Sequence, residues 1–186
     1  MECSIVVILV KFMNSWQLAH LSSLVPAGDY SKLTIPEGVK WGVRVIIPKD
    51  DGIVAVQHTK EDDSFWVLAG GGVEQGETIF DAAIREVQEE TNLNVSIERL
   101  LYIRVATYNN PVVEFYILAT IESGTLSLGS DPESDKKQVL TDTRVISFNE
   151  LEIDDTLTVY PVFMRKRLRN DLKTPPTKAL YIGTSL

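Results

Sequence analysis

Residues 71–93 read GGVEQGETIFDAAIREVQEETNL, and this stretch decides both the fold and the chemistry that the chain can support. A glycine-rich turn leads into a helical pattern, and side chains three and four residues apart share one face of a helix. Glu86, Glu89 and Glu90 would therefore crowd onto one patch, where each like-charged pair costs roughly 0.2–0.5 kcal/mol. Carboxylate clusters of this kind suit Mg²⁺, which also keeps waters and substrate phosphates as ligands. The stretch therefore favours a metal-dependent enzyme that acts on phosphates.

The ends of this helix are marked in the sequence. Thr78 with Asp81 three residues later is a capping-box pattern and predicts the helix start. Asn92 follows the last helical residue, and asparagine tolerates the left-handed conformation of a helix end. The apolar rhythm predicts a buried face, with the glutamates on the opposite side. The residues expected on the buried face are Phe80, Ala83, Ile84, Val87 and Thr91.

The spacing closely resembles the Nudix box, G-x5-E-x7-R-E-U-x-E-E-x-G-U, in which U is apolar. The positions that fall on it are Gly71, Glu77, Arg85, Glu86, Val87, Glu89, Glu90 and Leu93. Two departures are Asn92, where the family has glycine, and Ala69, where many members carry proline. The resemblance is strong in the box and looser over residues 38–172.

The resemblance implies an α+β fold, a Nudix-like α/β/α sandwich with a mixed β-sheet between helices. It also implies a divalent-metal-dependent pyrophosphohydrolase that uses Mg²⁺ or Mn²⁺ to cleave a pyrophosphate linkage in a nucleoside diphosphate derivative. Expected substrates are ADP-ribose or another nucleotide sugar, a dinucleotide, or a (deoxy)nucleoside triphosphate. The alternative is a non-catalytic Nudix-fold module that senses a nucleotide, and a third hypothesis is an acidic interaction protein that matches the box by accident.

Composition narrows the class of partner. The 186 residues carry a formal net charge of −8, which disfavours nucleic-acid polymers but not a small nucleotide bound through a cation. Cys3 is the only cysteine, so an intrachain disulfide is excluded and a cytoplasmic location fits. The apolar run Ser4–Val10 is too short for a membrane helix or secretory leader, and we expect a strand there. A homodimer is left open.

The chain is expected to form a single domain over residues 1–186. We predict an N-terminal extension at 1–37, a Nudix-like core at 38–172 and a loose tail at 173–186. A helical spacing spans 161–172. The predicted strands are Val43–Ile47, Ile53–Gln57, Ser64–Leu68, Val95–Ala106, Val112–Ile121 and Val139–Phe148.

Site residues follow from spacing and from the resemblance. The helix would hold Glu86, Glu89 and Glu90 as metal ligands on one rigid element. The resemblance adds the carbonyl oxygen of Gly71 as a further ligand. It also pairs Arg85 with Glu77, whereas the simpler alternative is a local i, i+4 salt bridge from Arg85 to Glu89.

The general base stays open between a box glutamate, Glu86 or Glu89, and a carboxylate on the later loop 124–137. On that loop we favour Glu133, although an acidic loop that only faces solvent is the simpler explanation.

The sequence gives weaker indications of which residues contact the substrate. Arg44 could meet a phosphate or face solvent, and Gly70 and Gly72 let backbone approach a ligand closely. Trp66 could stack on a base, although aromatic residues on strands more often belong to the core.

Overall fold

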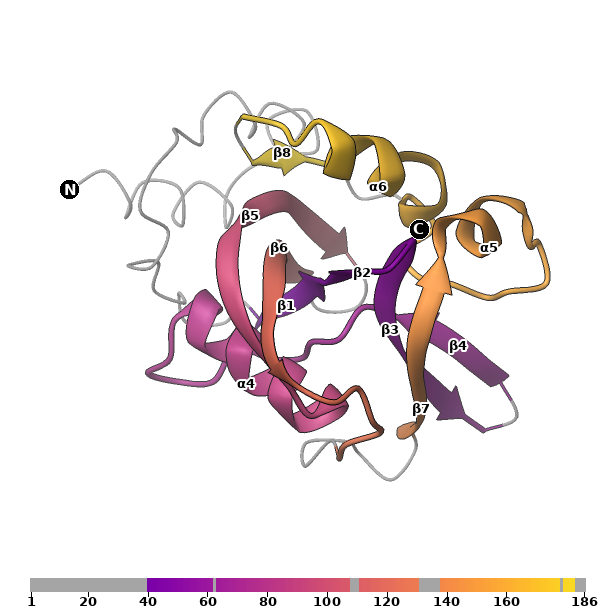
Figure 1. Cartoon of the computed structure of the whole chain (residues 1–186). Coiled ribbons are helices and arrows are strands. Elements are labelled where there is room, and N and C mark those ends of the chain that lie inside the picture. The colour runs from indigo at the N-terminus through magenta and orange to yellow at the C-terminus, as the bar shows by residue number, and fades with distance from the viewer. Residues whose placement is uncertain (1–39, 62, 108–110, 131–137, 178, 183–186) are drawn as a thin grey trace.

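The computed structural model describes residues 40–61, 63–107, 111–130, 138–177 and 179–182 (Figure 1). The strands are β1 (Lys40–Ile46), β2 (Pro48–Lys49), β3 (Gly52–Lys60), β4 (Asp63–Val67), β5 (Leu93–Thr107), β6 (Pro111–Gly124), β7 (Gln138–Ser147) and β8 (Leu180–Tyr181). The helices are α4 (Ile79–Thr91), α5 (Phe148–Ile153) and α6 (Met164–Lys173). The expected N-terminal extension and the strand predicted at Ser4–Val10 lie outside the described residues.

The strands form two sheets. In the first, the order is β1-β6-β5-β8, with β1 parallel to β6, β6 antiparallel to β5 and β5 parallel to β8. In the second, β3 pairs antiparallel with β2, β4 and β7. All six predicted strands are present, with ends that differ by a few residues. The expectation of a loose tail is wrong at Leu180–Tyr181, which adds an edge strand to β5.

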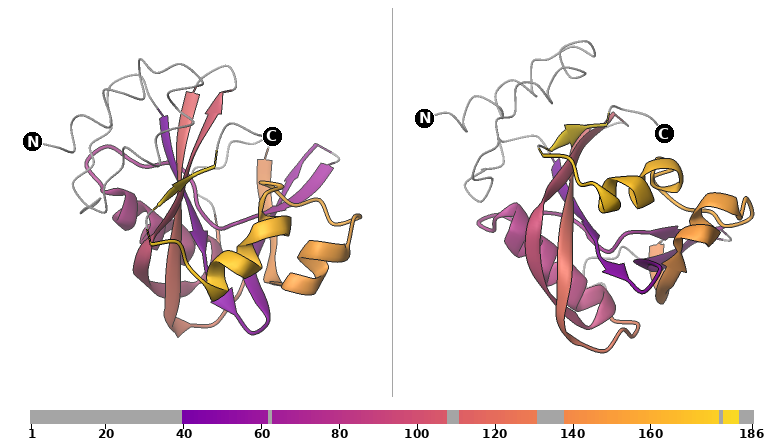
Figure 2. Two further views of the ribbon diagram at one scale, coloured as in Figure 1. Left: turned by 90° about the horizontal axis from the view of Figure 1, so that it is seen from above. Right: turned by 45° about the horizontal axis from the view of Figure 1, so that its top comes forward.

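Helices cover both sides of these sheets (Figure 2). One apolar cluster joins α4, through residues such as Ala83 and Val87, to β1, β5 and β6. A second cluster joins the opposite side of the strands to α5 and α6, through residues such as Leu151 and Leu168. The expected α/β/α sandwich is therefore confirmed. None of the helices in the described ranges has both the length and the apolar character needed to cross a lipid bilayer.

Helix α4 begins and ends where the sequence predicts. The Thr78 hydroxyl accepts a hydrogen bond from the backbone N–H of Asp81, and the Asp81 carboxylate accepts one from the backbone N–H of Thr78. Asn92 closes the helix in the left-handed conformation with φ of 56°. Both predictions of the helix ends are confirmed.

The predicted buried face of α4 is partly wrong. Ile84 is 40% exposed, whereas Ile79 and Ala82 are buried. Glu86 and Glu90, which were expected on the face opposite the core, are only 4% and 1% exposed. The reason is that α4 is covered on two sides, by the sheet and by the glycine turn that precedes it.

The chain after β6 caps the end of α4. The backbone N–H groups of Ser127, Gly129 and Ser130 donate to the carbonyl oxygens of Thr91, Glu90 and Glu89 at 3.1, 3.0 and 2.8 Å. The last carbonyls of a helix have no partner within the helix, so these bonds complete it. The loop thereby holds the end of α4 that carries the glutamates.

Asn92 supports this cap with its side chain, so we expect its replacement to cost stability. Its amide nitrogen lies 3.1 Å from the Ser127 hydroxyl and 3.3 Å from the Ser127 carbonyl oxygen. Asn92→Ala should lower the free energy of unfolding in urea by about 1–2 kcal/mol, because it loses these bonds and keeps a Cβ in the left-handed region. Asn92→Gly should cost less than half of that. The control Asn94→Ala loses one exposed bond to Ser123 and should cost about 0.5 kcal/mol or less. An Asn92→Ala chain as stable as the unmodified one would contradict this account of the cap.

Candidate active site

The glycine turn, residues 69–72, runs antiparallel to β1. Val45 N–H donates to the Ala69 carbonyl at 2.8 Å, and Val43 N–H donates to the Gly71 carbonyl at 2.9 Å. In extended backbone the polar groups of alternate residues point to opposite edges. The N–H and carbonyl groups of Gly70 and Gly72 therefore point away from β1, towards groups on the other side of the turn.

Gly70 uses both of its backbone groups in this way. Its N–H donates to the Glu90 carboxylate at 2.8 Å, and its carbonyl oxygen accepts a hydrogen bond from Arg44. Its φ of +142° suits glycine, and a Cβ at this position would overlap the Val43 carbonyl. Gly70 is therefore the residue at which β1 and the end of α4 meet.

Gly71 lies directly against Glu86. A Cβ at position 71 would come within 2.5–2.7 Å of the Glu86 carboxylate. The carboxylate thus reaches the backbone of the turn only because no side chain intervenes.

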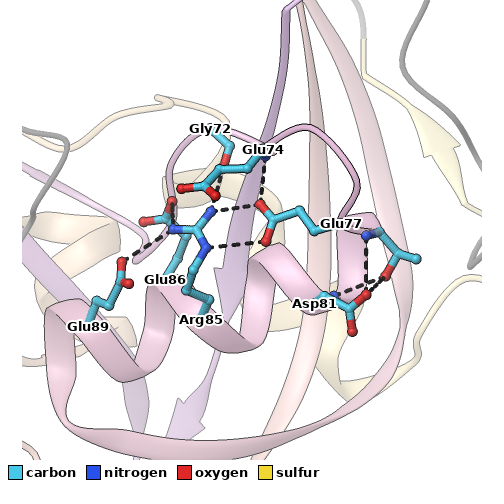
Figure 3. A network of polar contacts seen from close by, with 8 residues as sticks. Gly72, Glu74, Glu77, Asp81, Arg85, Glu86 and Glu89 are labelled. Carbon is cyan, nitrogen blue, oxygen red and sulfur yellow. Dashed lines mark hydrogen bonds and ion pairs between the residues drawn. The ribbon is translucent and has the colours of Figure 1, made fainter.

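Arg85 joins the turn, the preceding loop and the helix in one network (Figure 3). Its Nη2 donates to Glu77 at 2.8 Å and to the Gly72 carbonyl at 3.0 Å, and its Nε donates to Glu77 at 3.2 Å. Its Nη1 donates to Glu86 at 2.9 Å and to Glu89 at 3.2 Å. The pairing with Glu77 and the alternative i, i+4 bridge to Glu89 are therefore both present.

The charges in this network shift the pKa values in opposite directions. Burial raises the pKa of Glu86 to about 7; Arg85 opposes this rise, and the negative charges of Glu90 and Glu89 add to it. Partial burial also acts to raise the pKa of Glu77, but hydrogen bonds from Arg85 and the Glu74 backbone outweigh it and lower the pKa. The hydrogen bond to Glu77 raises the pKa of Arg85 above its ordinary value, against the opposing effect of burial.

Glu90 is held separately from the other two helix glutamates. Besides the Gly70 N–H, its carboxylate lies 3.6 Å from Nε2 of His58, which is buried on β3. In the sequence, no metal-ligand spacing surrounds His58. Its contact with Glu90 depends on strand packing, which spacing along the chain does not reveal.

The three helix glutamates do not converge as closely as their spacing suggests. Arg85 draws Glu86 and Glu89 together, whereas Glu90 turns towards Gly70. Among the described residues, no group of three or more histidine, cysteine, aspartate or glutamate side chains is gathered closely enough to hold a metal ion. A cation bound by Glu86 and Glu89 would have to compete with Nη1 of Arg85 for their oxygens.

The residues nevertheless fit a hard divalent cation in chemistry. Their donors are carboxylate oxygens, which Mg²⁺ and Mn²⁺ prefer. The carboxylate of Glu86 reaches the turn through the space that a Cβ of residue 71 would fill. The Gly71 carbonyl oxygen, expected as a ligand, is bonded to the backbone of β1, and the alternation along the turn puts the Gly70 carbonyl on the glutamate side instead.

The predicted substrate residues are placed differently from one another. Trp66 is 7% exposed, belongs to the apolar cluster beneath α5 and α6, and has Arg144 over its ring at 4.8 Å. Its expected stacking on a base is therefore wrong, because the ring is used in the core. Arg44 is half-buried beside Gly70 and Glu114 rather than directed into solvent. Glu133, the expected loop base, lies outside the described residues.

Two glycines of the turn, with Gly76 of the following loop as control, offer a graded test of the backbone argument. We expect Gly70→Ala to lower the free energy of unfolding by at least about 3 kcal/mol, because it combines backbone strain with a clash against β1. Gly71→Ala should cost less, since the Glu86 side chain can move. The control Gly76→Ala keeps a φ of +97° with no atom within 4 Å of its Cβ, and should cost about 1–2 kcal/mol. Urea unfolding measures all three, and equal losses at Gly70 and Gly76 would contradict the close approach to β1.

Comparison with known proteins places this geometry in a family. The family model described as the NUDIX domain matches residues 38–166. Dihydroneopterin triphosphate diphosphatase of Escherichia coli (strain K12) is 41% identical over 59 residues, which is 32% of this chain and 39% of that protein. The chain therefore spans well under two thirds of this relative. ADP-ribose pyrophosphatase of Methanocaldococcus jannaschii is 28% identical over 123 residues, covering 64% of this chain and 73% of that protein.

Solved structures agree on the fold. A NUDIX hydrolase from Nitrosomonas europaea superposes with a TM-score of 0.61 at 20% sequence identity, covering 81% of this chain and 83% of that one. The family model spans well over half of the chain and includes the glycine turn and the glutamate helix. The chain therefore belongs to the Nudix family.

Proposed function

We propose that the chain is a divalent-metal-dependent hydrolase that cleaves a pyrophosphate linkage in a nucleoside diphosphate derivative. The observation that carries this proposal is the joining of Glu86, Glu89 and Glu90, on one helix, to a glycine turn through Arg85 and the Gly70 N–H. A helix and a strand-bound turn are rigid supports, as a catalytic constellation requires. The names of two relatives, a diphosphatase and a pyrophosphatase, support the same class of reaction.

Glu86, Glu89 and Glu90 would hold the cation, which we propose to be Mg²⁺ or Mn²⁺, together with a backbone carbonyl of the turn. A bound divalent ion neutralises phosphate oxygens and lowers the pKa of a coordinated water. Glu86 and Glu89 stay the proposed catalytic glutamates of the helix. The base itself remains a choice between one of them and Glu133.

Arg85 and Glu77 act as positioning residues in this proposal. The guanidinium fixes Glu77, the Gly72 carbonyl and two helix carboxylates at once, so the turn and helix keep one relative placement. Burial, with a smaller contribution from the charges of Glu90 and Glu89, raises the pKa of Glu86 to about 7 although Arg85 opposes the rise, so the site would gain from a further positive charge.

The substrate class follows from charge and from relatives. ADP-ribose or another nucleotide sugar, a dinucleotide and a (deoxy)nucleoside triphosphate all carry a pyrophosphate linkage beside a nucleoside. The acidic chain favours such a small ligand over a nucleic-acid polymer. We also propose a cytoplasmic location and leave a homodimer open.

Turnover on a substrate panel tests the proposed function. Purified chain is incubated with Mg²⁺ and ADP-ribose, NADH, diadenosine polyphosphates or deoxynucleoside triphosphates, and release of nucleoside monophosphate or pyrophosphate is followed. We expect the unmodified chain to turn over at least one of these substrates. Loss of a residue that only supports a metal ligand typically costs about 10–100-fold, and Glu89→Gln and Glu90→Gln should each reduce turnover by more than that. EDTA should abolish turnover, and added Mg²⁺ should restore it.

Glu122→Gln is the matched control, because it removes one negative charge from an exposed glutamate on β6. Its turnover should equal that of the unmodified chain. Tight nucleotide binding without turnover on any substrate would favour the sensor module instead. If the chain shows no nucleotide binding and no turnover, the acidic interaction protein is the only one of the three hypotheses that is left.

Arg85→Ala tests the positioning role separately. We expect turnover or Mg²⁺ affinity to fall by about 10–100-fold, the range for residues that orient metal ligands. Arg85→Lys should restore little, since a lysine cannot donate from five positions in one plane. Unchanged turnover together with unchanged Mg²⁺ affinity in Arg85→Ala would show that the network is only a surface salt bridge.

A further inference from the structure

A small cleft of about 150 Å³ lies beside the glycine turn, on the face of the first sheet that is turned away from α4. Arg44, Arg104, Glu114 and Tyr116 form its polar floor, and Val67, Tyr160 and Pro161 form its wall. The proposed reaction uses none of these residues, and the sequence left the role of Arg44 open.

Strand register brings the polar floor together. Arg104 on β5 lies directly opposite Glu114 on β6, and Arg44 on β1 lies beside Tyr116 on β6. Residues two apart on a strand share a face, so Glu114 and Tyr116 point the same way. Four polar side chains from three neighbouring strands therefore form one surface.

Glu114 holds this surface in a fixed arrangement. One of its oxygens accepts hydrogen bonds from Arg104 at 2.6 Å and from the Tyr116 hydroxyl at 3.0 Å, and the other lies 3.8 Å from Nε of Arg44. Burial and the charge of Glu114 raise the pKa of Tyr116 above its ordinary value, so its hydroxyl stays a donor. The floor therefore carries two guanidinium charges and one carboxylate, bridged to one another.

Tyr160 supplies a flat apolar surface beside this floor. Its ring is 48% exposed and meets Phe65 edge-on, with centroids 5.7 Å apart. Its backbone N–H donates to the Trp66 carbonyl at 2.9 Å, which fixes the ring's attachment to β4. An aromatic ring that is anchored yet half open to solvent is suited to stacking against another flat ring.

The cleft is tied to the glutamates by two hydrogen bonds. Arg44 donates to the Gly70 carbonyl, and the Gly70 N–H donates to Glu90. A ligand in the cleft would therefore lie beside the glycine turn, which the carboxylates of Glu86 and Glu90 contact.

We propose that this cleft binds the nucleobase of the substrate, while the phosphates lie towards the glutamates of α4. The floor keeps a single net positive charge and also presents the carboxylate of Glu114, an acceptor that a phosphate dianion, having no proton to donate, cannot use. A neutral flat ring with both donors and acceptors matches a floor that presents both, and it can stack on Tyr160.

The size of the cleft agrees with this assignment. Pockets that enclose a whole drug-sized ligand measure roughly 300–1,000 Å³. About 150 Å³ is room for one moiety of a nucleotide and not for all of it. The inference rests on the proposed function, because that function supplies a substrate with a nucleoside end.

The test compares ligands with and without a base on the full chain in Mg²⁺ buffer. AMP, GMP, CMP and UMP are titrated beside ribose 5-phosphate by calorimetry. None of these ligands has a pyrophosphate bond, so binding is measured without turnover. We expect at least one nucleoside monophosphate to bind tenfold or more tightly than ribose 5-phosphate.

Variants then assign the preference to Tyr160. Tyr160→Ala should weaken the preferred monophosphate by roughly 5- to 150-fold, the range for loss of one base–aromatic stack, and leave ribose 5-phosphate unchanged. Tyr160→Phe keeps the ring and should bind like the unmodified chain. The control Val162→Ala trims another exposed apolar side chain that does not line the cleft, and should change neither ligand.

Two results would overturn the inference: equal affinity for the monophosphates and ribose 5-phosphate, or equal weakening of both ligand types in Tyr160→Ala. The first comparison needs no variant, so it decides even if Tyr160→Ala does not fold. Base-dependent binding without pyrophosphate hydrolysis would remove the proposed function and keep the base site. Hydrolysis without base-dependent binding would keep the proposed function and remove the base site.

Discussion

The guanidinium of Arg85 is the contact on which the candidate site depends. It meets five acceptor oxygens: two of Glu77, one each of Glu86 and Glu89, and the Gly72 carbonyl. Hydrogen bonds between charged partners are roughly twice as strong as neutral ones, and a planar fork fixes direction as well as distance. Helix α4, the loop before it and the glycine turn are thereby held as one unit. Without this cation, three acidic groups would face one another across the same small volume.

Arg85 does not fully compensate for the burial of negative charge at the site. Glu86 has only 4% of its surface exposed, and its pKa rises to about 7 because burial and the nearby glutamates outweigh the arginine. A buried ionised carboxylate is costly unless it is paired. The fold therefore keeps a group near the glycine turn that gains from further positive charge. That property agrees with the metal-dependent chemistry proposed above and has no evident use in a helix that serves only as a packing element.

The sequence predicted this region better than its surroundings for identifiable reasons. Helix ends depend on local hydrogen bonds, so Thr78, Asp81 and Asn92 were sufficient to place them. The buried face of α4 depends on what packs against the helix. Spacing alone therefore misassigned Ile84, which is exposed, and Glu86 and Glu90, which the glycine turn covers. His58, Trp66 and Leu180 show the same limit. Their roles arise from strands brought together by register, and neither spacing nor composition within a segment reports register between segments.

Gly70 connects the helix carboxylates to the cleft through its own backbone N–H and carbonyl groups. Its N–H binds Glu90 on α4, and its carbonyl binds Arg44 at the edge of the base cleft. Because extended backbone directs both groups of one residue to the same edge, a single glycine can serve the carboxylates and the cleft together. Any side chain there would overlap β1, so this double contact requires glycine. A displacement of the turn would move Glu90 and Arg44 at once, which means that the groups nearest the phosphates and those nearest the base are placed by the same short piece of backbone.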